Sequence, residues 1–138
     1  MVKRDIEMLK DVVFYEDTKV RLAADVYLPH SKTKRPALLL VHGGAWQAGA
    51  KESLHQWGFF LAEAGYVAVS VSYRLSTPET STWPYVLDDI QAAYDFLLNH
   101  EEEWQVERDR IGVIGASAGA HLATLFALTP PSQAHIKA

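Results

Sequence analysis

The sequence contains no cysteine in its 138 residues, which excludes disulfides, thiolate nucleophiles and cysteine-based zinc sites. Positive charge is also scarce, because 13 Lys and Arg stand against 17 Asp and Glu and give a formal net charge of -4. The basic residues form no cluster or stripe. A nucleic acid would bind against this overall field, so we expect no nucleic-acid partner.

Long hydrophobic runs are missing as well. Residues 1–10 carry several charges and have no apolar run behind them, so we expect neither a signal peptide nor a membrane anchor. Together with the lack of cysteine, this favours a cytoplasmic protein without a membrane partner. Apolar residues make up 49% of the chain, and no repeat or break in composition marks a linker. Residues 1–138 are therefore expected to form a single domain.

The apolar pattern predicts an α/β fold. Two extended segments, Val12–Tyr15 and Val20–Leu28, flank a polar turn and predict an antiparallel hairpin at one edge of a sheet. Three later apolar runs lack alternation, as is typical of parallel strands that are buried on both faces. These runs are Ala37–Val41, Tyr66–Val71 and Arg110–Ile114.

Three helices with one apolar stripe each are predicted between and after these strands. The first helix is predicted from the apolar positions Leu54, Trp57, Leu61 and Ala64 and ends at Gly65. The second begins after Pro84, has its apolar stripe between Val86 and Leu98, and runs to about Asn99. The third has Leu122, Leu125 and Phe126 as its apolar positions and ends at Pro130-Pro131. Alternating strands and helices imply a parallel sheet with helices on both faces, joined by right-handed crossovers.

The strongest local motif is Gly115-Ala116-Ser117-Ala118-Gly119, between the last of these strands and its helix. A strand that reverses into a helix within a few residues forces its apex residue into a strained backbone region, where flanking bulk would collide. Small residues on both sides keep that space open. The Ser117 hydroxyl is then expected above the carboxyl edge of the sheet, next to a helix N-terminus whose partial positive charge favours an anion.

A second motif, His42-Gly43-Gly44-Ala45-Trp46, directly follows the buried run Ala37–Val41, where a parallel sheet places its ligand crevice. Adjacent glycines allow bare backbone N–H groups to face inward, and donors fixed in this way stabilise a tetrahedral oxyanion. We therefore expect this loop to form an oxyanion hole. His42, at the head of the loop, is expected to anchor it by hydrogen bonds and not to act as a base.

Together these motifs resemble the α/β-hydrolase esterases and lipases related to hormone-sensitive lipase and to the bifunctional feruloyl and acetyl xylan esterases. The similarity runs nearly from end to end of the chain. It also includes Asp25-Val26-Tyr27-Leu28-Pro29, Ser72-Tyr73-Arg74-Leu75, Trp83-Pro84 with Asp88-Asp89, and Ala120-His121-Leu122-Ala123.

The resemblance implies the N-terminal half of an α/β-hydrolase fold and the hydrolysis of a small-molecule carboxylic ester, with no cofactor and no metal. It implies that Ser117 attacks the ester carbonyl while the N–H groups of Gly43, Gly44 and Ala118 hold the oxyanion. Water then releases the acid from the acyl-enzyme. Kynurenine formamidase is similar in the same motifs, so amide or formamide hydrolysis is the near alternative.

The sequence departs from this family in the partners of the serine. In this fold an Asp or Glu and then a His follow the nucleophile along the chain, but no Asp or Glu occurs between residues 110 and 138. The histidines in that stretch are His135 and His121, which lies one helical turn beyond Ser117 and is not expected to reach its hydroxyl. Three other histidines are expected to be surface or core residues: His30, His55 and His100.

We therefore expect a partial α/β-hydrolase domain that lacks the C-terminal strands and the acid and histidine of the triad. The strand before Ser117, central in the family, would then be an open apolar edge available for self-association. The open alternative is a non-catalytic hydrolase-like fragment or binding module. A phosphate-binding loop is not predicted, although Gly44–Lys51 nearly fits one, because Lys51 comes one residue late and Glu52 replaces the metal-binding hydroxyl.

Overall fold

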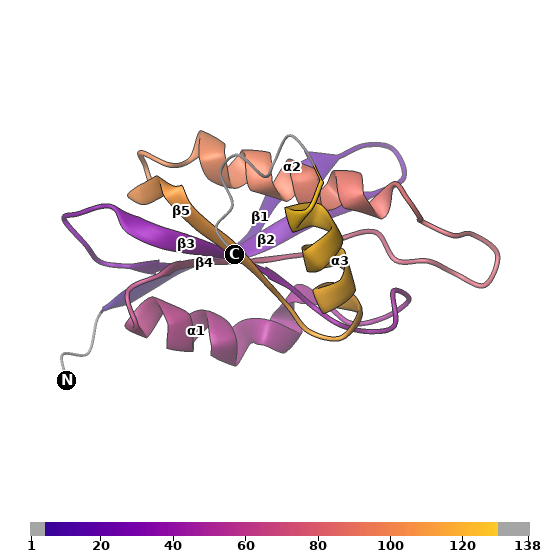
Figure 1. The fold of residues 1–138 in the computed structure, drawn as a ribbon, viewed down its shortest axis with the longest axis horizontal. Coiled ribbons are helices and arrows are strands. Elements are labelled where there is room, and N and C mark those ends of the chain that lie inside the picture. Colours follow the sequence, from indigo (N-terminus) through magenta and orange to yellow (C-terminus); the bar gives the residue numbers. More distant parts are fainter. Residues whose placement is uncertain (1–4, 130–138) are drawn as a thin grey trace.

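The computed structural model describes residues 5–129, which form one five-stranded sheet in the order β1-β2-β4-β3-β5. Helix α1 lies against one face of the sheet, and α2 and α3 cover the other face (Figure 1). In chain order the elements are β1 (Ile6–Glu16), β2 (Arg21–Pro29), β3 (Arg35–Val41), the short helix η1 (Lys51–Leu54), α1 (His55–Glu63), β4 (Val67–Val71), α2 (Val86–Asn99), β5 (Val106–Gly115) and α3 (Ala118–Ala127).

The strand directions confirm the predicted fold class. Strands β1 and β2 form an antiparallel hairpin, β2 also pairs antiparallel with β4, and β3 lies parallel between β4 and β5. Strand β5 begins at Val106, earlier than the predicted Arg110, because Val106 pairs with Arg35 of β3. An irregularity in the register separates this pair from Ala37 and Ile111, and the charged residues within it interrupt the apolar run.

Two apolar cores hold the layers together, one on each face of the sheet. The larger core joins Leu39 and Val69 of the sheet to Ile90 of α2 and Leu122 of α3. The smaller core lies under α1 and is built around Tyr27. Apolar area removed from water contributes about 25 cal/mol per Å², so these faces supply most of the favourable free energy of folding.

The face that α1 buries agrees with the predicted stripe only in part, because Leu54 and Leu61 pack against the smaller core but Trp57 does not. Gly58 and Ala62 are buried, whereas Trp57 is 58% exposed. The reason is the Tyr27 ring, which lies so close to Gly58 that an added Cβ would be 2.4 Å from its Cε2 atom. Small residues therefore face the sheet, and the larger Trp57 lies at the side of the helix. Helix α3 ends at Ala127; Pro130-Pro131 and His135 lie outside the described residues.

Strand β5 is the last strand of the sheet. Within residues 5–129 it pairs with β3 and with no other strand, so its second edge carries no ladder there. Self-association through this edge stays a prediction. No helix in the described part of the chain is long and apolar enough to cross a membrane.

Candidate active site

Ser117 occupies the tight turn between β5 and α3, and residues 115–119 are called the serine turn below. Its backbone angles are φ 53 and ψ -118, a strained conformation for a residue with a side chain, and the residue is exposed. The flanking glycines have no room for a side chain. A Cβ on Gly115 would lie 2.2 Å from the Gly119 carbonyl oxygen, and one on Gly119 would lie 2.0 Å from the Val41 carbonyl oxygen.

Helix α3 begins immediately after the serine. Ala118 is buried and is the first residue of the helix. Because the first N–H groups of a helix have no acceptor within it, the Ala118 N–H group is free of the helix's own hydrogen bonds. The first turn is closed by Gly119 N–H, which donates to the Ala116 carbonyl at 2.8 Å, and by Ala120 N–H, which donates to the Ser117 carbonyl at 2.9 Å. The positive end of the helix dipole therefore lies at Ser117.

Residues 42–50, called the glycine loop below, leave β3 next to the serine turn. Three successive residues, Gly44, Ala45 and Trp46, have φ values of 135, 54 and 63. This left-handed run folds the chain back, so that the N–H groups of Gln47 and Ala48 both donate to the Gly44 carbonyl, at 3.0 and 2.9 Å. The sequence predicts a turn here, but the left-handed conformation of Ala45 and Trp46 has no signal in their residue types.

The two loops are in contact. A Cβ built on Gly43 would lie 2.7 Å from the Ala116 carbonyl oxygen and 3.2 Å from Ser117 Cβ. The Ala116 N–H group donates to the Val41 carbonyl at 3.2 Å, which fixes the serine turn to the end of β3. The structure thus brings Gly43 and Ser117, two residues singled out separately in the sequence, to one point at the carboxyl edge of the sheet.

His42 is buried beneath the glycine loop. Its ring stacks on Tyr73 with centroids 4.3 Å apart, and its Nδ1 lies 2.7 Å from the Gly43 carbonyl oxygen, so Nδ1–H is the donor. The Tyr73 hydroxyl donates to the His42 carbonyl at 2.7 Å. Burial lowers the pKa of His42, and the hydrogen bond to Gly43 opposes this only in part. This geometry agrees with the anchoring role predicted for the residue.

The lowered pKa of His42 predicts a loss of stability in mild acid. The folded protein holds the neutral ring, whereas the unfolded chain takes up a proton near the ordinary value of 6.5. The unfolded state therefore binds more protons below that pH, so the free energy of unfolding falls as the pH drops through and below about 6.5. His42→Asn keeps a donor for Gly43 without titrating. Urea unfolding at about pH 7.5 and about pH 5.5 should show a smaller acid loss for this variant than for the wild type; equal losses would contradict the prediction.

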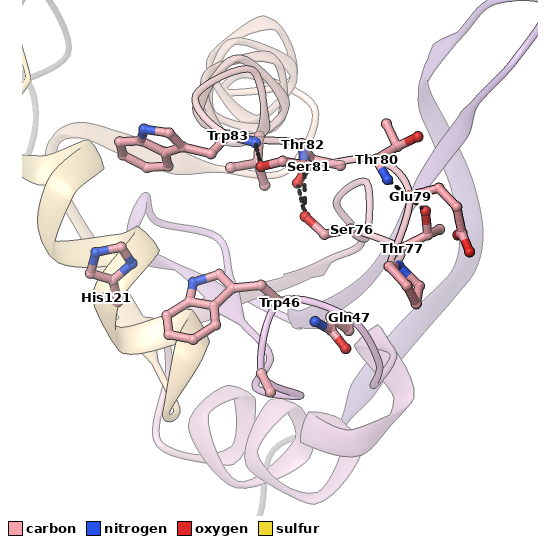
Figure 2. A pocket seen from close by; sticks show the side chains of 13 residues that line it. Trp46, Gln47, Ser76, Thr77, Glu79, Thr80, Ser81, Thr82, Trp83 and His121 are labelled. Atoms are coloured by element: carbon pink, nitrogen blue, oxygen red, sulfur yellow. Dashed lines mark hydrogen bonds between the residues drawn. The ribbon is translucent and has the colours of Figure 1, made fainter.

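A cavity of about 460 Å³ opens beside the glycine loop and His121 of α3 (Figure 2). Its aromatic side is formed by Trp46, Trp83 and His121. The Trp46 ring is edge-on to the His121 ring with centroids 5.5 Å apart, and the centroids of Trp83 and His121 are 6.1 Å apart. Its opposite side is the hydroxyl-rich segment 76–82. Sequence reasoning did not identify this wall, because a run of Ser, Thr and Pro is typical of any surface loop.

Asp89 anchors the segment between β4 and α2. Its side chain is 2% exposed and accepts hydrogen bonds from the Arg74 backbone N–H at 2.9 Å, from Nε at 2.9 Å and from Nη2 at 2.8 Å. From the sequence, Asp88-Asp89 and Arg74 were identified only as parts of the family resemblance. A carboxylate on the apolar stripe of an amphipathic helix, three residues after Val86 and four before Ala93, is the signal that could have identified this anchor.

The sheet order, the strained serine turn and the glycine loop beside it define an α/β hydrolase. Solved structures agree: the chain superposes on a bacterial heroin esterase with a TM-score of 0.74 at 31% identity, covering 90% of this chain and 38% of that one. An esterase of Rhizomucor miehei gives a TM-score of 0.78 at 25% identity, covering 99% and 43%.

Within this class, the chain belongs to the BD-FAE family, whose sequence pattern matches residues 24–135. It is 38% identical over 96 residues to the probable carboxylic ester hydrolase LipM of Mycobacterium tuberculosis, covering 69% of this chain and 22% of that protein. It is 34% identical over 115 residues to a probable isoprenylcysteine alpha-carbonyl methylesterase of Arabidopsis thaliana, covering 83% and 23%. The chain thus spans about a quarter of the length of these two relatives.

Proposed function

We propose that this chain carries the nucleophile and the oxyanion hole of a carboxylic ester hydrolase. Ser117 is the nucleophile, and the N–H groups of Gly43, Gly44 and Ala118 bind the oxyanion. The contact between the glycine loop and the serine turn carries this proposal, because it places Gly43 beside a strained, exposed serine. Esterases among its relatives and structural neighbours support the reaction class.

The proposed reaction has two steps. The Ser117 Oγ adds to the ester carbonyl, and the negative charge that develops on the carbonyl oxygen is held by the backbone donors and by the N-terminus of α3. The alcohol leaves with a proton, and water then hydrolyses the acyl-enzyme and releases the acid. A base takes the Ser117 proton during the attack and gives it to the departing alcohol. The His121 ring contacts Trp46 and Trp83, and we assign it no role as that base.

An active-site phosphonate tests the proposed nucleophile directly. The reagent should form a covalent adduct at Ser117 that mass spectrometry of tryptic peptides locates, and Ser117→Ala should abolish the adduct. Ser81→Ala is the matched control, because Ser81 is another exposed serine, lies in the wall of the 460 Å³ cavity and should leave labelling unchanged. An unlabelled wild-type Ser117, or equal ester hydrolysis by the wild type and Ser117→Ala, would refute a catalytic role for this serine in the isolated polypeptide.

A further inference from the structure

Lys51 is a buried cation at the far end of the glycine loop. Its side chain is 6% exposed, and its Nζ lies 2.6 Å from Asp11 Oδ1, 2.9 Å from Asp25 Oδ1 and 2.5 Å from Glu52 Oε1. Burial alone would lower the pKa of Lys51, but hydrogen bonds to Asp11, Glu52 and Asp25 raise it above its ordinary value. Lys51 is therefore charged, and three carboxylates surround it.

Both the side chain and the backbone of Lys51 are fixed to the sheet. Asp25, which is fully buried, lies in β2 opposite Ser70 of β4 in the strand register. The Ser70 hydroxyl is also buried and donates to the Lys51 carbonyl at 2.8 Å. Two neighbouring strands thus hold one residue at two points, directly after the glycine loop ends.

The edge strand β1 contacts the same cation through an irregularity in its pairing. The register of the β1–β2 pair shifts between Leu9 and Val12, and Asp11 within this irregularity has a φ of 56. A left-handed backbone is unfavourable for a residue with a side chain, so the position of Asp11 calls for a compensating contact. Its N–H group donates to Asp25 Oδ1 at 2.9 Å while its carboxylate binds Lys51. The strained irregularity at Asp11 therefore contacts both Lys51 and Asp25.

These contacts act on the loop through the chain. The glycine loop is a continuous segment between two fixed ends, Val41 of β3 and Lys51. Near its second end, Gly49 has a φ of 89, and a Cβ there would lie 2.1 Å from the Gly43 carbonyl oxygen. A shift of the backbone at Lys51 would therefore reach Gly43 across this close approach as well as along the loop.

We propose that Lys51, held by Asp25 and Asp11, is a positioning residue that fixes the glycine loop against the serine turn. The inference rests on the proposed function, since it concerns the placement of Gly43 and Gly44. Replacing a buried ion pair by apolar groups is often neutral for stability. The cluster is thus poorly explained as a source of stability alone, whereas a charge surrounded by three acceptors fixes where its backbone lies.

Amide hydrogen exchange of the glycine loop tests this role. The N–H groups of Gln47 and Ala48 are bonded to Gly44 within the loop and report its closed form. In Lys51→Met they should exchange about tenfold faster or more, relative to the amide of Leu39 in β3. Lys34→Met is the matched control, because Lys34 pairs with Glu102 on the surface and should leave all three amides unchanged.

A double variant separates positioning from stability. Lys51→Met leaves Asp25 buried with an uncompensated charge, so the single variant is expected to unfold more easily. Lys51→Met/Asp25→Asn removes both charges and should recover the denaturant midpoint, while Gln47 and Ala48 still exchange about tenfold faster than in the wild type. Recovery of loop protection together with the midpoint, or a rise in exchange that Leu39 shares equally, would overturn the positioning role.

The phosphonate reaction gives the second readout. If Ser117 of the wild type is labelled, the double variant should be labelled about tenfold more slowly, because the oxyanion donors are no longer fixed; an equal rate would overturn the proposal. If the wild type is not labelled, the proposed function fails, and the exchange of Gln47 and Ala48 still decides whether Lys51 holds the loop. The two failures are therefore distinguishable.

Discussion

Gly119→Ala should destabilise the protein by about 3 kcal/mol and remove phosphonate labelling of Ser117. The added methyl group would lie 2.0 Å from the Val41 carbonyl oxygen and 2.5 Å from that of His42, and both are backbone atoms that cannot rotate away. The N-terminus of α3 must therefore move off the end of β3. This movement separates the serine turn from the glycine loop, because Gly43 contacts the serine turn through the same region.

Chemical denaturation and labelling of the same sample check this prediction. Thr124→Ala is the control on the same helix, since Thr124 is exposed and, among residues 5–129, its hydroxyl bonds only to the Ala120 carbonyl one turn earlier. It should change the free energy of unfolding by less than about 0.5 kcal/mol. A Gly119→Ala protein with wild-type stability and labelling would show that β3 and α3 can separate without cost.

Asp89→Ala should lower the free energy of unfolding by about 2 to 3 kcal/mol. The substitution leaves the Arg74 backbone N–H and guanidinium without their acceptor in a largely buried position. Breaking a fully buried pair costs about 3 to 5 kcal/mol, and the Arg74 side chain is 31% exposed, so water recovers part of that loss.

Its neighbour provides the comparison for Asp89. Asp88→Ala also removes one carboxylate from the first turn of α2, but Asp88 is exposed. Loss of its favourable interaction with the helix dipole should cost about 0.5 kcal/mol. Denaturant midpoints of the two variants measure the difference. Equal midpoints would mean that Asp89 acts only through the helix dipole and that its contact with Arg74 contributes nothing.

The sequence was sufficient for the parts of the fold that depend on local pattern. Unbroken apolar runs predicted strands β3 and β4, because a strand that is covered on both faces carries apolar side chains on both sides. Glycine spacing predicted the serine turn, and Ser117 indeed has the strained backbone conformation that an apex requires. The role of that serine, and those of Gly43, Gly44 and Ala118, remain predictions.

The rest depended on contacts between distant residues. In the sequence, Lys51 resembled a phosphate-loop lysine that comes one residue late. Its ion pair with Asp25 becomes visible only in the structure, where β2 pairs with β4. The stripe that predicted α1 included Trp57, yet the Tyr27 ring of strand β2 favours a smaller residue on the buried face of the helix. Periodicity cannot report which side of a helix a remote aromatic ring will occupy.

The two walls of the cavity are not independent parts. The Ser76 N–H group donates to the Trp46 carbonyl at 2.8 Å, so the hydroxyl-rich segment is joined to the left-handed run of the glycine loop. Insertions or deletions between residues 76 and 82 would pull on the very backbone that turns at Trp46. If the proposed oxyanion donors are correct, selection for a differently shaped ligand at this wall would alter them too, and changes in specificity and in rate should arise together.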